Sequence, residues 1–520
     1  MSRFYNKSES QKQKNIAQSD GISSNISKHA ANTVIWDGSI CGCGNNKKCT
    51  RCVNLVQDPS FEWQAFEWIT SNTDFTDSSA FEGAIQAALG PGVAVLEQEI
   101  SLRGVRECPL LFSFNAFADI NPATNENPGI LIVQISWLDE NFNFIGLGLR
   151  MLVPADRLNN NARITFIAQT DVIPKNAAFA KLAFTKGEGL SEENDCIYID
   201  NVILAPMAFQ NLIKNGGFEA NLFGWTADSD NGPAFHSSYS ESLVDSGHVI
   251  TTNSGALYQD VNIRQLSHKY PFLLGFAVQG DGRVELSVHV EWLNQNGITI
   301  GTGLCASIPN ETLDNQENYL SYLFVTSPPI CGATTARIIF EADVPNTGDF
   351  LRLDQVLFIP VLSCNLVSNP SFENNLNNWC HDLATRVQRN DVYEGSYAAR
   401  LDLTGGALWQ DVDLYCPEGQ SFLLSIGIGF RQTSVESIYG TTIIKVIWLD
   451  KHGRELGEGL NLISSRNLVS DIVNSMSWVH YIGITDPAPE GAAKARILIT
   501  RTDGNQGFVE IDNVVFARIV

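Results

Sequence analysis

Four cysteines within twelve positions carry the most distinctive chemistry of this chain: Cys41, Cys43, Cys49 and Cys52. Four thiolates at such spacing could hold a tetrahedral zinc ion, and the Cys-x-x-Cys half is typical of zinc sites. The Cys-x-Cys half is unusual for one, so a second interpretation stays open. On a flexible basic segment, the same thiols could form disulfides in oxidising surroundings. The cluster predicts either a zinc site or a cross-linking head that joins copies of the protein or other surface proteins.

No short motif of a catalytic centre accompanies this cluster. The sequence has no nucleophile elbow, HExxH motif, phosphate-binding loop or dinucleotide fingerprint. Its eight histidines are scattered along the chain. Three copies of one unit fill most of the chain and leave no region large enough for a separate catalytic domain. We therefore predict that the protein is not an enzyme.

The three copies are recognised by blocks that recur in one order. The opening block, Asn-Leu-(Val/Ile)-x-(Asn/Asp)-(Pro/Gly)-x-Phe-Glu, begins at Asn54, Asn211 and Asn365. A Leu-x-Gln block, a Trp-Leu-(Asp/Asn) block and an (Ile/Leu)-Asp-(Asn/Gln)-Val block follow in each copy, and their spacing drifts by four residues or fewer. Each copy is long enough to be a domain that folds alone. We predict repeats at 54–210, 211–364 and 365–520, after a disordered basic tail at 1–35 and a cysteine-rich head at 36–53.

Within each copy the hydrophobic pattern has the period of a β-strand. From Val284 to Trp292, apolar residues alternate with polar ones, as in a half-buried strand, and polar turn residues follow directly. No long segment has the period of a helix. The pattern therefore predicts an all-β fold of two packed sheets. The tryptophans on the apolar side of their strands are expected in the core, and those after the opening blocks at one end of the sandwich: Trp137, Trp292 and Trp448, then Trp68, Trp225 and Trp379.

The opening, middle and closing blocks resemble those of jelly-roll carbohydrate-binding modules of the xylan- and cellulose-binding type, which are galactose-binding-like β-sandwiches. The resemblance covers about 54–520. It implies three tandem jelly-roll domains and a polysaccharide or glycan as partner. Because this fold also serves adhesion and scaffolding, the ligand follows less directly than the fold.

The resemblance also implies structural calcium ions. In that family, the acid of the opening block and the aspartate of the closing block often share a cation, and a hard cation prefers such oxygen ligands. The alternative is that each acid caps a turn or bonds backbone amides. The pairs in this sequence are Glu62 with Asp200, Glu219 with Asp354, and Glu373 with Asp512.

Aromatic side chains on a polar strand face are the candidates for stacking on sugar rings. In the third copy, Trp409 and Asp411 lie on the side opposite to the Leu and Gln of the Leu-x-Gln block. Tyr258 and Asp260 hold these positions in the second copy, whereas the first copy has Glu97 in place of the aromatic residue. An exposed aromatic beside acids fits a sugar-binding face, and it fits a contact between domains equally well.

The net charge of the chain limits the partners that it can bind. The net charge of −23 repels phosphate backbones, so we do not expect nucleic-acid binding.

No apolar run approaches the length of a transmembrane helix, and the N-terminus lacks the apolar core of a secretory signal. We therefore expect synthesis in the cytoplasm and a final place on a bacterial spore or particle surface. Two functions remain: a non-catalytic surface protein that binds glycan, or a structural protein of a spore coat, exosporium or similar particle that is cross-linked through the cysteine head.

Overall fold

The structure, a computed structural model, describes the chain from residue 53 to residue 519 with short gaps. The residues left out are 1–52, 64–66, 78–79, 121–126, 161–162, 191–194, 229–233, 240, 267, 314–318, 403–404, 432–439, 465–475, 503–506 and 520. The described residues form six five-stranded sheets and one short helix, α2 (Asn310–Leu313). The predicted all-β class is thus confirmed. In the described part, no helix is long and apolar enough to cross a membrane.

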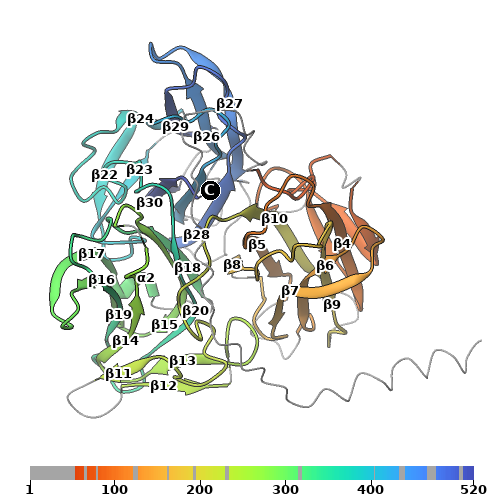
Figure 1. The fold of residues 1–520 in the computed structure, drawn as a ribbon, viewed down its shortest axis with the longest axis horizontal. Coiled ribbons are helices and arrows are strands. Elements are labelled where there is room, and N and C mark those ends of the chain that lie inside the picture. The colour runs from red at the N-terminus through yellow and green to blue at the C-terminus, as the bar shows by residue number, and fades with distance from the viewer. Residues whose placement is uncertain are drawn as a thin grey trace, which may run out of the picture. The chain divides into compact units, whose positions relative to one another are not determined.

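The first repeat forms two antiparallel sheets (Figure 1). Its first sheet has the order β1 (Ile69–Ser71), β4 (Ala94–Ser101), β9 (Phe179–Lys186), β6 (Leu131–Leu138) and β7 (Phe144–Val153). Its second sheet has the order β2 (Thr73–Thr76), β3 (Gln86–Leu89), β10 (Ile197–Pro206), β5 (Leu110–Ala118) and β8 (Ile164–Gln169).

The second repeat has the same topology. Its first sheet has the order β11 (Thr226–Asp228), β14 (Gly255–Asn262), β19 (Thr335–Asp343), β16 (Glu285–Leu293) and β17 (Thr299–Ile308). Its second sheet has the order β12 (Phe235–Ser238), β13 (His248–Thr251), β20 (Phe350–Pro360), β15 (Phe272–Asp281) and β18 (Leu320–Val325).

The third repeat follows the same plan again. Its first sheet has the order β21 (Cys380–Asp382), β24 (Ala407–Asp413), β29 (Lys494–Arg501), β26 (Thr442–Leu449) and β27 (Glu455–Ser464). Its second sheet has the order β22 (Ala384–Gln388), β23 (Tyr397–Leu401), β30 (Phe508–Ala517), β25 (Leu423–Arg431) and β28 (Met476–Ile484). Every sheet stays within one repeat.

Each repeat has an apolar core between its two sheets. The tryptophans of the Trp-Leu-(Asp/Asn) blocks are at most 1% exposed, which confirms their prediction as core residues: Trp137, Trp292 and Trp448. The tryptophans after the opening blocks are also buried. Their indole Nε1 atoms donate to backbone oxygens of the opening blocks at 3.1 Å, so they anchor that segment to the core.

Two other motif residues tie distant segments of a repeat together. In the first repeat, Asn54 bonds the backbone of Val202 and Leu204 in the last strand. Gln98 of the Leu-x-Gln block bonds both the N–H and the carbonyl of Gln57. The same contacts recur in the other repeats, so these blocks recur because they join the ends of the sandwich.

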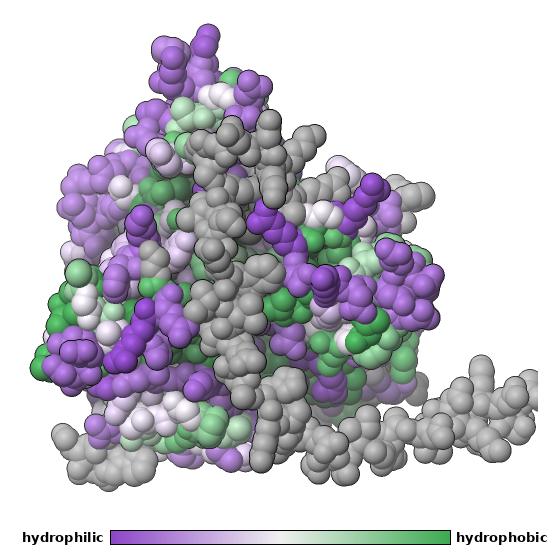
Figure 2. All heavy atoms as spheres, in the orientation of Figure 1, coloured by the Kyte–Doolittle hydropathy of each residue, from purple (hydrophilic) through white to green (hydrophobic). Residues whose placement is uncertain are grey.

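The described residues after position 53 belong to one compact unit. Beyond the three cores, a fourth apolar cluster draws residues from all three repeats. On the face of the molecule drawn in Figure 2, hydrophilic residues cover much of the surface and hydrophobic residues occupy separate small areas. That each repeat folds alone stays a prediction, and the shared cluster argues for mutual support.

Candidate functional site

The candidate site of the third repeat lies on the outer face of its first sheet. Trp409 on β24 is half-buried there, while its neighbours Leu408 and Gln410 are buried on the core side. Asp411 lies two residues further on the same outer face, opposite Arg496 on β29. The guanidinium of Arg496 donates to both carboxylate oxygens of Asp411, at 2.6 and 2.8 Å. The outer face thus places an indole ring beside a paired acid and guanidinium.

The second repeat builds the same arrangement with a smaller ring. Tyr258 is half-buried on the outer face of β14, and Asp260 follows it. Arg337 donates to both oxygens of Asp260, at 2.7 and 2.8 Å. The Arg337 guanidinium also lies over the Tyr258 ring, 4.5 Å from its centroid. A sugar that stacked on this face of the ring would have to displace the guanidinium.

The first repeat has no aromatic residue in this slot. Glu97 takes the position of Tyr258 and Trp409, and it forms an ion pair with Lys181 at 2.8 Å. Lys181 pairs in register with Glu99, as Arg337 does with Asp260 and Arg496 with Asp411, so the cation recurs in all three repeats. In this slot the first repeat therefore has an ion pair in place of an aromatic ring.

The two arginines are site residues that the sequence analysis missed. A signal for them exists, because a short Ala-(Arg/Lys)-(Ile/Leu) block recurs in β9, β19 and β29. The hydrogen bond that the Arg496 guanidinium donates to Asp411 raises the pKa of Arg496, and the one that Arg337 donates to Asp260 raises the pKa of Arg337. Both cations therefore stay charged beside the rings and can donate to ligand oxygens.

The carboxylates that the resemblance assigns to calcium meet at one loop in each repeat. In the first repeat, Glu62 Oε1 accepts the N–H groups of Ala84 and Ile85 at 2.6 and 2.7 Å. Asp200 Oδ2 accepts the N–H of Glu82 at 2.8 Å, and its Oδ1 accepts the N–H of the next residue at 2.7 Å. The other two pairs contact the equivalent loops in the same way: Glu219 with Asp354, and Glu373 with Asp512.

Backbone amides, which are the donors that these acids meet, suit an anion and not a cation. The acids therefore form the amide bonds that the sequence left open as an alternative. Burial raises the pKa of Asp200, Asp354 and Asp512 well above the usual range of aspartate. Among the described residues, no group of three or more His, Cys, Asp or Glu side chains gathers as metal ligands.

Calcium at these pairs stays a prediction of the resemblance, and removing bound cations with a chelator tests it. Because N–H donors already occupy both oxygens of the aspartates, we expect EDTA to leave the Tm of the full chain unchanged in a thermal melt. Adding excess CaCl₂ to the chelated sample is the control. A Tm that falls with EDTA and returns with calcium would establish the cation instead.

Cys41, Cys43, Cys49 and Cys52 lie outside the described residues. Zinc binding and cross-linking at the head therefore both stay predictions.

No family model matches the sequence, and no curated protein matches it. Solved structures that match include the enzymatically active domain of tailspike protein 4 from bacteriophage CBA120, at 21% identity, 30% of this chain, 21% of that chain and a TM-score of 0.24. This chain thus spans about a fifth of the tailspike domain's length. The tandem CBM22-1-CBM22-2 domain of Paenibacillus barcinonensis Xyn10C matches at 13% identity, 61% of this chain, 100% of that chain and a TM-score of 0.24. The module TmCBM61, solved with β-1,4-galactotriose, matches at 21% identity, 30% of this chain, 99% of that chain and a TM-score of 0.21.

Proposed function

We propose that the protein is a non-catalytic glycan-binding protein whose main binding surface is the outer face of the first sheet in the third repeat. The observation that carries this proposal is the position of Trp409 on that face, beside the paired Asp411 and Arg496. The same combination of aromatic ring, acid and arginine recurs in the second repeat.

The chemistry of this face suits a sugar. An indole ring offers an apolar surface to the C–H face of a pyranose, and the polar groups next to it exchange hydrogen bonds with hydroxyls. The Asp411–Arg496 pair is oriented by its own two hydrogen bonds, so it needs little reordering when a ligand arrives.

The second repeat is expected to bind more weakly. Its tyrosine ring is smaller than an indole, and the Arg337 guanidinium occupies one face of the ring. Two such faces in one chain still raise the avidity for a polymer, because the second contact becomes intramolecular.

A glycan-binding screen on the full chain, followed by titration of the best polysaccharide, tests the proposal. We expect Trp409→Ala to weaken binding about 30-fold, the effect of losing an aromatic anchor worth about 2 kcal/mol. Tyr258→Ala should have a smaller effect. Trp63→Ala is the matched control, because Trp63 is 80% exposed but belongs to neither face: it directly follows the opening block of the first repeat. The absence of binding to any polysaccharide, or equal binding by Trp409→Ala and wild type, would refute the proposal.

A further inference from the structure

One loop of each repeat reaches into a neighbouring repeat. These joint loops are residues 80–83, 242–245 and 392–395, and each precedes the second strand of its second sheet. Their large side chains pack in a neighbour's core: Phe81 in the core of the third repeat, Leu243 in that of the first and Tyr393 in that of the second. Every repeat thus completes its core with a residue from another repeat.

The joint between the first and third repeats shows how the loop is held. The N–H of Gly83 donates to the carbonyl of Ile463 at 2.8 Å, and the N–H of Ile463 donates back to Glu82 Oε1 at 3.0 Å. The hydroxyl of Tyr481 donates to the carbonyl of Phe81 at 2.9 Å, and the two rings are 4.4 Å apart. Backbone pairing and aromatic packing therefore act together.

The same geometry occurs at the joint between the third and second repeats. The N–H of Gly395 donates to the carbonyl of Ser307 at 2.7 Å, and the N–H of Ser307 points back to Glu394 Oε1 at 3.5 Å. Tyr393 donates its hydroxyl to the carbonyl of Ser321, and its ring stacks on Tyr322 at 4.3 Å.

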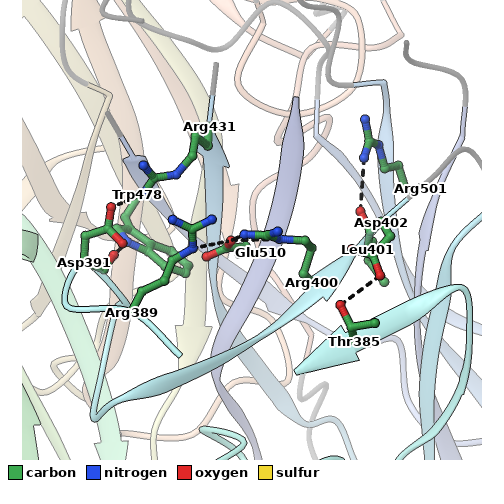
Figure 3. Close-up of polar contacts among 10 residues, drawn as sticks. All are labelled: Thr385, Arg389, Asp391, Arg400, Leu401, Asp402, Arg431, Trp478, Arg501 and Glu510. Carbon is green, nitrogen blue, oxygen red and sulfur yellow. Dashed lines mark hydrogen bonds and ion pairs between the residues drawn. The ribbon is translucent and has the colours of Figure 1, made fainter. Parts of the chain in front are cut away.

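Polar contacts also hold the residues on either side of this loop in the sequence. Figure 3 shows Glu510, which is buried, between Arg389 and Arg400, and Asp391 beside Arg431. The indole of Trp478 donates to the carbonyl of Asp391 at 2.8 Å. Two side chains of the second repeat bond the start of this loop: Glu311 accepts a hydrogen bond from Asn390, and Thr312 donates one to the carbonyl of Val392.

The joint between the second and first repeats keeps the contact with different residues. The N–H of Asp245 donates to the carbonyl of Leu152 at 2.6 Å, and the N–H of Leu152 donates back to Asp245 Oδ1 at 3.0 Å. Val244 stands where the other loops have glutamate, and Asp245 stands where they have glycine. The carboxylate has moved by one position, but it still accepts the same N–H.

The three contacts close a cycle. Leu152, Ser307 and Ile463 each lie fifteen residues after the core tryptophan of their repeat, so they are equivalent positions. The first repeat's loop binds the third repeat, the third binds the second, and the second binds the first. A head-to-tail contact that closes after three units satisfies every joint surface.

The closing motif serves the joint as well. Asp200 and Asp512 hold the joint loops of their own repeats by accepting the N–H groups of Glu82 and Glu394. The asparagines that follow these aspartates bond a neighbouring repeat: Asn201 Nδ2 donates to the carbonyl of Ile482, and Asn513 Nδ2 donates to that of Leu323, both at 3.0 Å. The shared apolar cluster lies beside these bonds and includes Leu111, Ile167, Leu273, Leu323, Leu423 and Ile482.

We propose that the three repeats are interdependent parts of one closed assembly, in which the joint surface of each repeat is a binding site for another copy of the same unit. A repeat released from the chain should therefore stay bound to the other two. This inference does not rest on glycan binding, so either proposal can fail while the other stands.

Cutting the folded full chain tests this inference. A protease site is inserted after Cys364, which is exposed in the join between the second and third repeats. After cleavage we expect the third repeat to elute with the other two in size-exclusion chromatography without denaturant, because two joints and the shared cluster hold it. Separation of the fragments would overturn the proposal.

Variants of the cleavable chain locate the binding surface. Phe81→Ala with Tyr393→Ala weakens both joints of the third repeat, and we expect the cut fragments to separate. Phe112→Ala is the matched control, because Phe112 is fully buried in the first repeat's own core. The control fragments should stay together. Fragments of the double variant that stay together as firmly as wild type would contradict the assignment of these loops.

Discussion

Replacing Glu82 and Glu394 by glutamine is expected to leave the protein as stable as wild type near pH 4.5 and to make it more stable above neutral pH. Both glutamates accept an N–H group from a neighbouring repeat at the joints. Burial raises the pKa of each from 4.5 to about 7. Glutamine copies the protonated acid in shape and charge, so the variant keeps the joint as it is at low pH.

The sign of the effect follows from proton linkage. Between about pH 4.5 and pH 7 the folded protein keeps two protons that the unfolded chain releases, so these groups stabilise the fold less as the pH rises. The loss is complete above the folded pKa. A shift of this size corresponds to about 3 kcal/mol for each glutamate. The variant should therefore gain up to that amount per site over wild type, together with a higher Tm at alkaline pH.

Two buried histidines make the comparison with the variant necessary. Burial lowers the pKa of His248 to about 4 and that of His480 to about 3. Each stabilises the fold above the usual pKa of histidine, and that stability is lost as the pH falls, which is opposite to the glutamates. Wild type alone would show the sum of both effects and that of the closing aspartates, whose pKa values burial also raises. The difference between variant and wild type cancels the histidines and reports the two joint glutamates together with their charge coupling to Asp200 and Asp512.

Thermal and urea melts of both proteins from about pH 4.5 to about pH 8.5 measure this difference. Glu99→Gln is the control, because Glu99 is exposed on the outer face of the first repeat. It should change stability by less than about 0.5 kcal/mol at every pH. A constant difference between the double variant and wild type across the range would show that the two joint glutamates do not titrate with folding.

The fold was predictable because its signals are local and repeated. Alternation along Val284–Trp292 predicts a strand, and its tryptophan is buried as its parity requires. The blocks recur at nearly constant spacing in all three copies, so they mark the positions that every copy of the sandwich requires. Trp409 could be placed on the outer face for the same reason, since parity decides which side of a strand a residue occupies.

The joints could not be predicted in this way. Phe81 looks like an ordinary loop residue, and only the tertiary structure shows that it packs in another repeat's core. The resemblance assigns the closing aspartates to calcium, and the sequence does not show the backbone amides that meet them. In the second repeat, the carboxylate moved from the position of Glu82 to that of Gly83, so a comparison of aligned residues hides the shared contact.

Gly148→Ala is expected to destabilise the first repeat strongly. A Cβ at position 148 would lie 2.5 Å from Cζ2 and 2.6 Å from Cε2 of Trp137, which is closer than packed atoms approach. Trp137 is fully buried on all sides and cannot move away without disturbing the core. Overpacking of this kind typically costs about 3 kcal/mol at the upper end, which is several degrees in Tm.

Gly146→Ala provides a matched control on the same strand and against the same ring. Its added Cβ would lie 3.7 Å from Cδ1 of Trp137, an ordinary van der Waals contact. Because both glycines lie in β7, the two variants share any loss or gain from placing alanine in a strand. The difference between their thermal melts therefore reports the collision with the indole alone.

A second substitution at the ring tests whether the collision is the cause. Trp137→Phe removes part of the indole and is destabilising by itself, because it leaves a cavity. With Gly148→Ala, the new methyl group enters the space that the indole leaves. We expect the double variant to be more stable than the sum of the two single effects by at least about 1 kcal/mol. The equivalent pairs, Gly303 with Trp292 and Gly459 with Trp448, have the same close approach. Strict additivity in the first repeat would therefore remove the steric explanation for the glycine in all three.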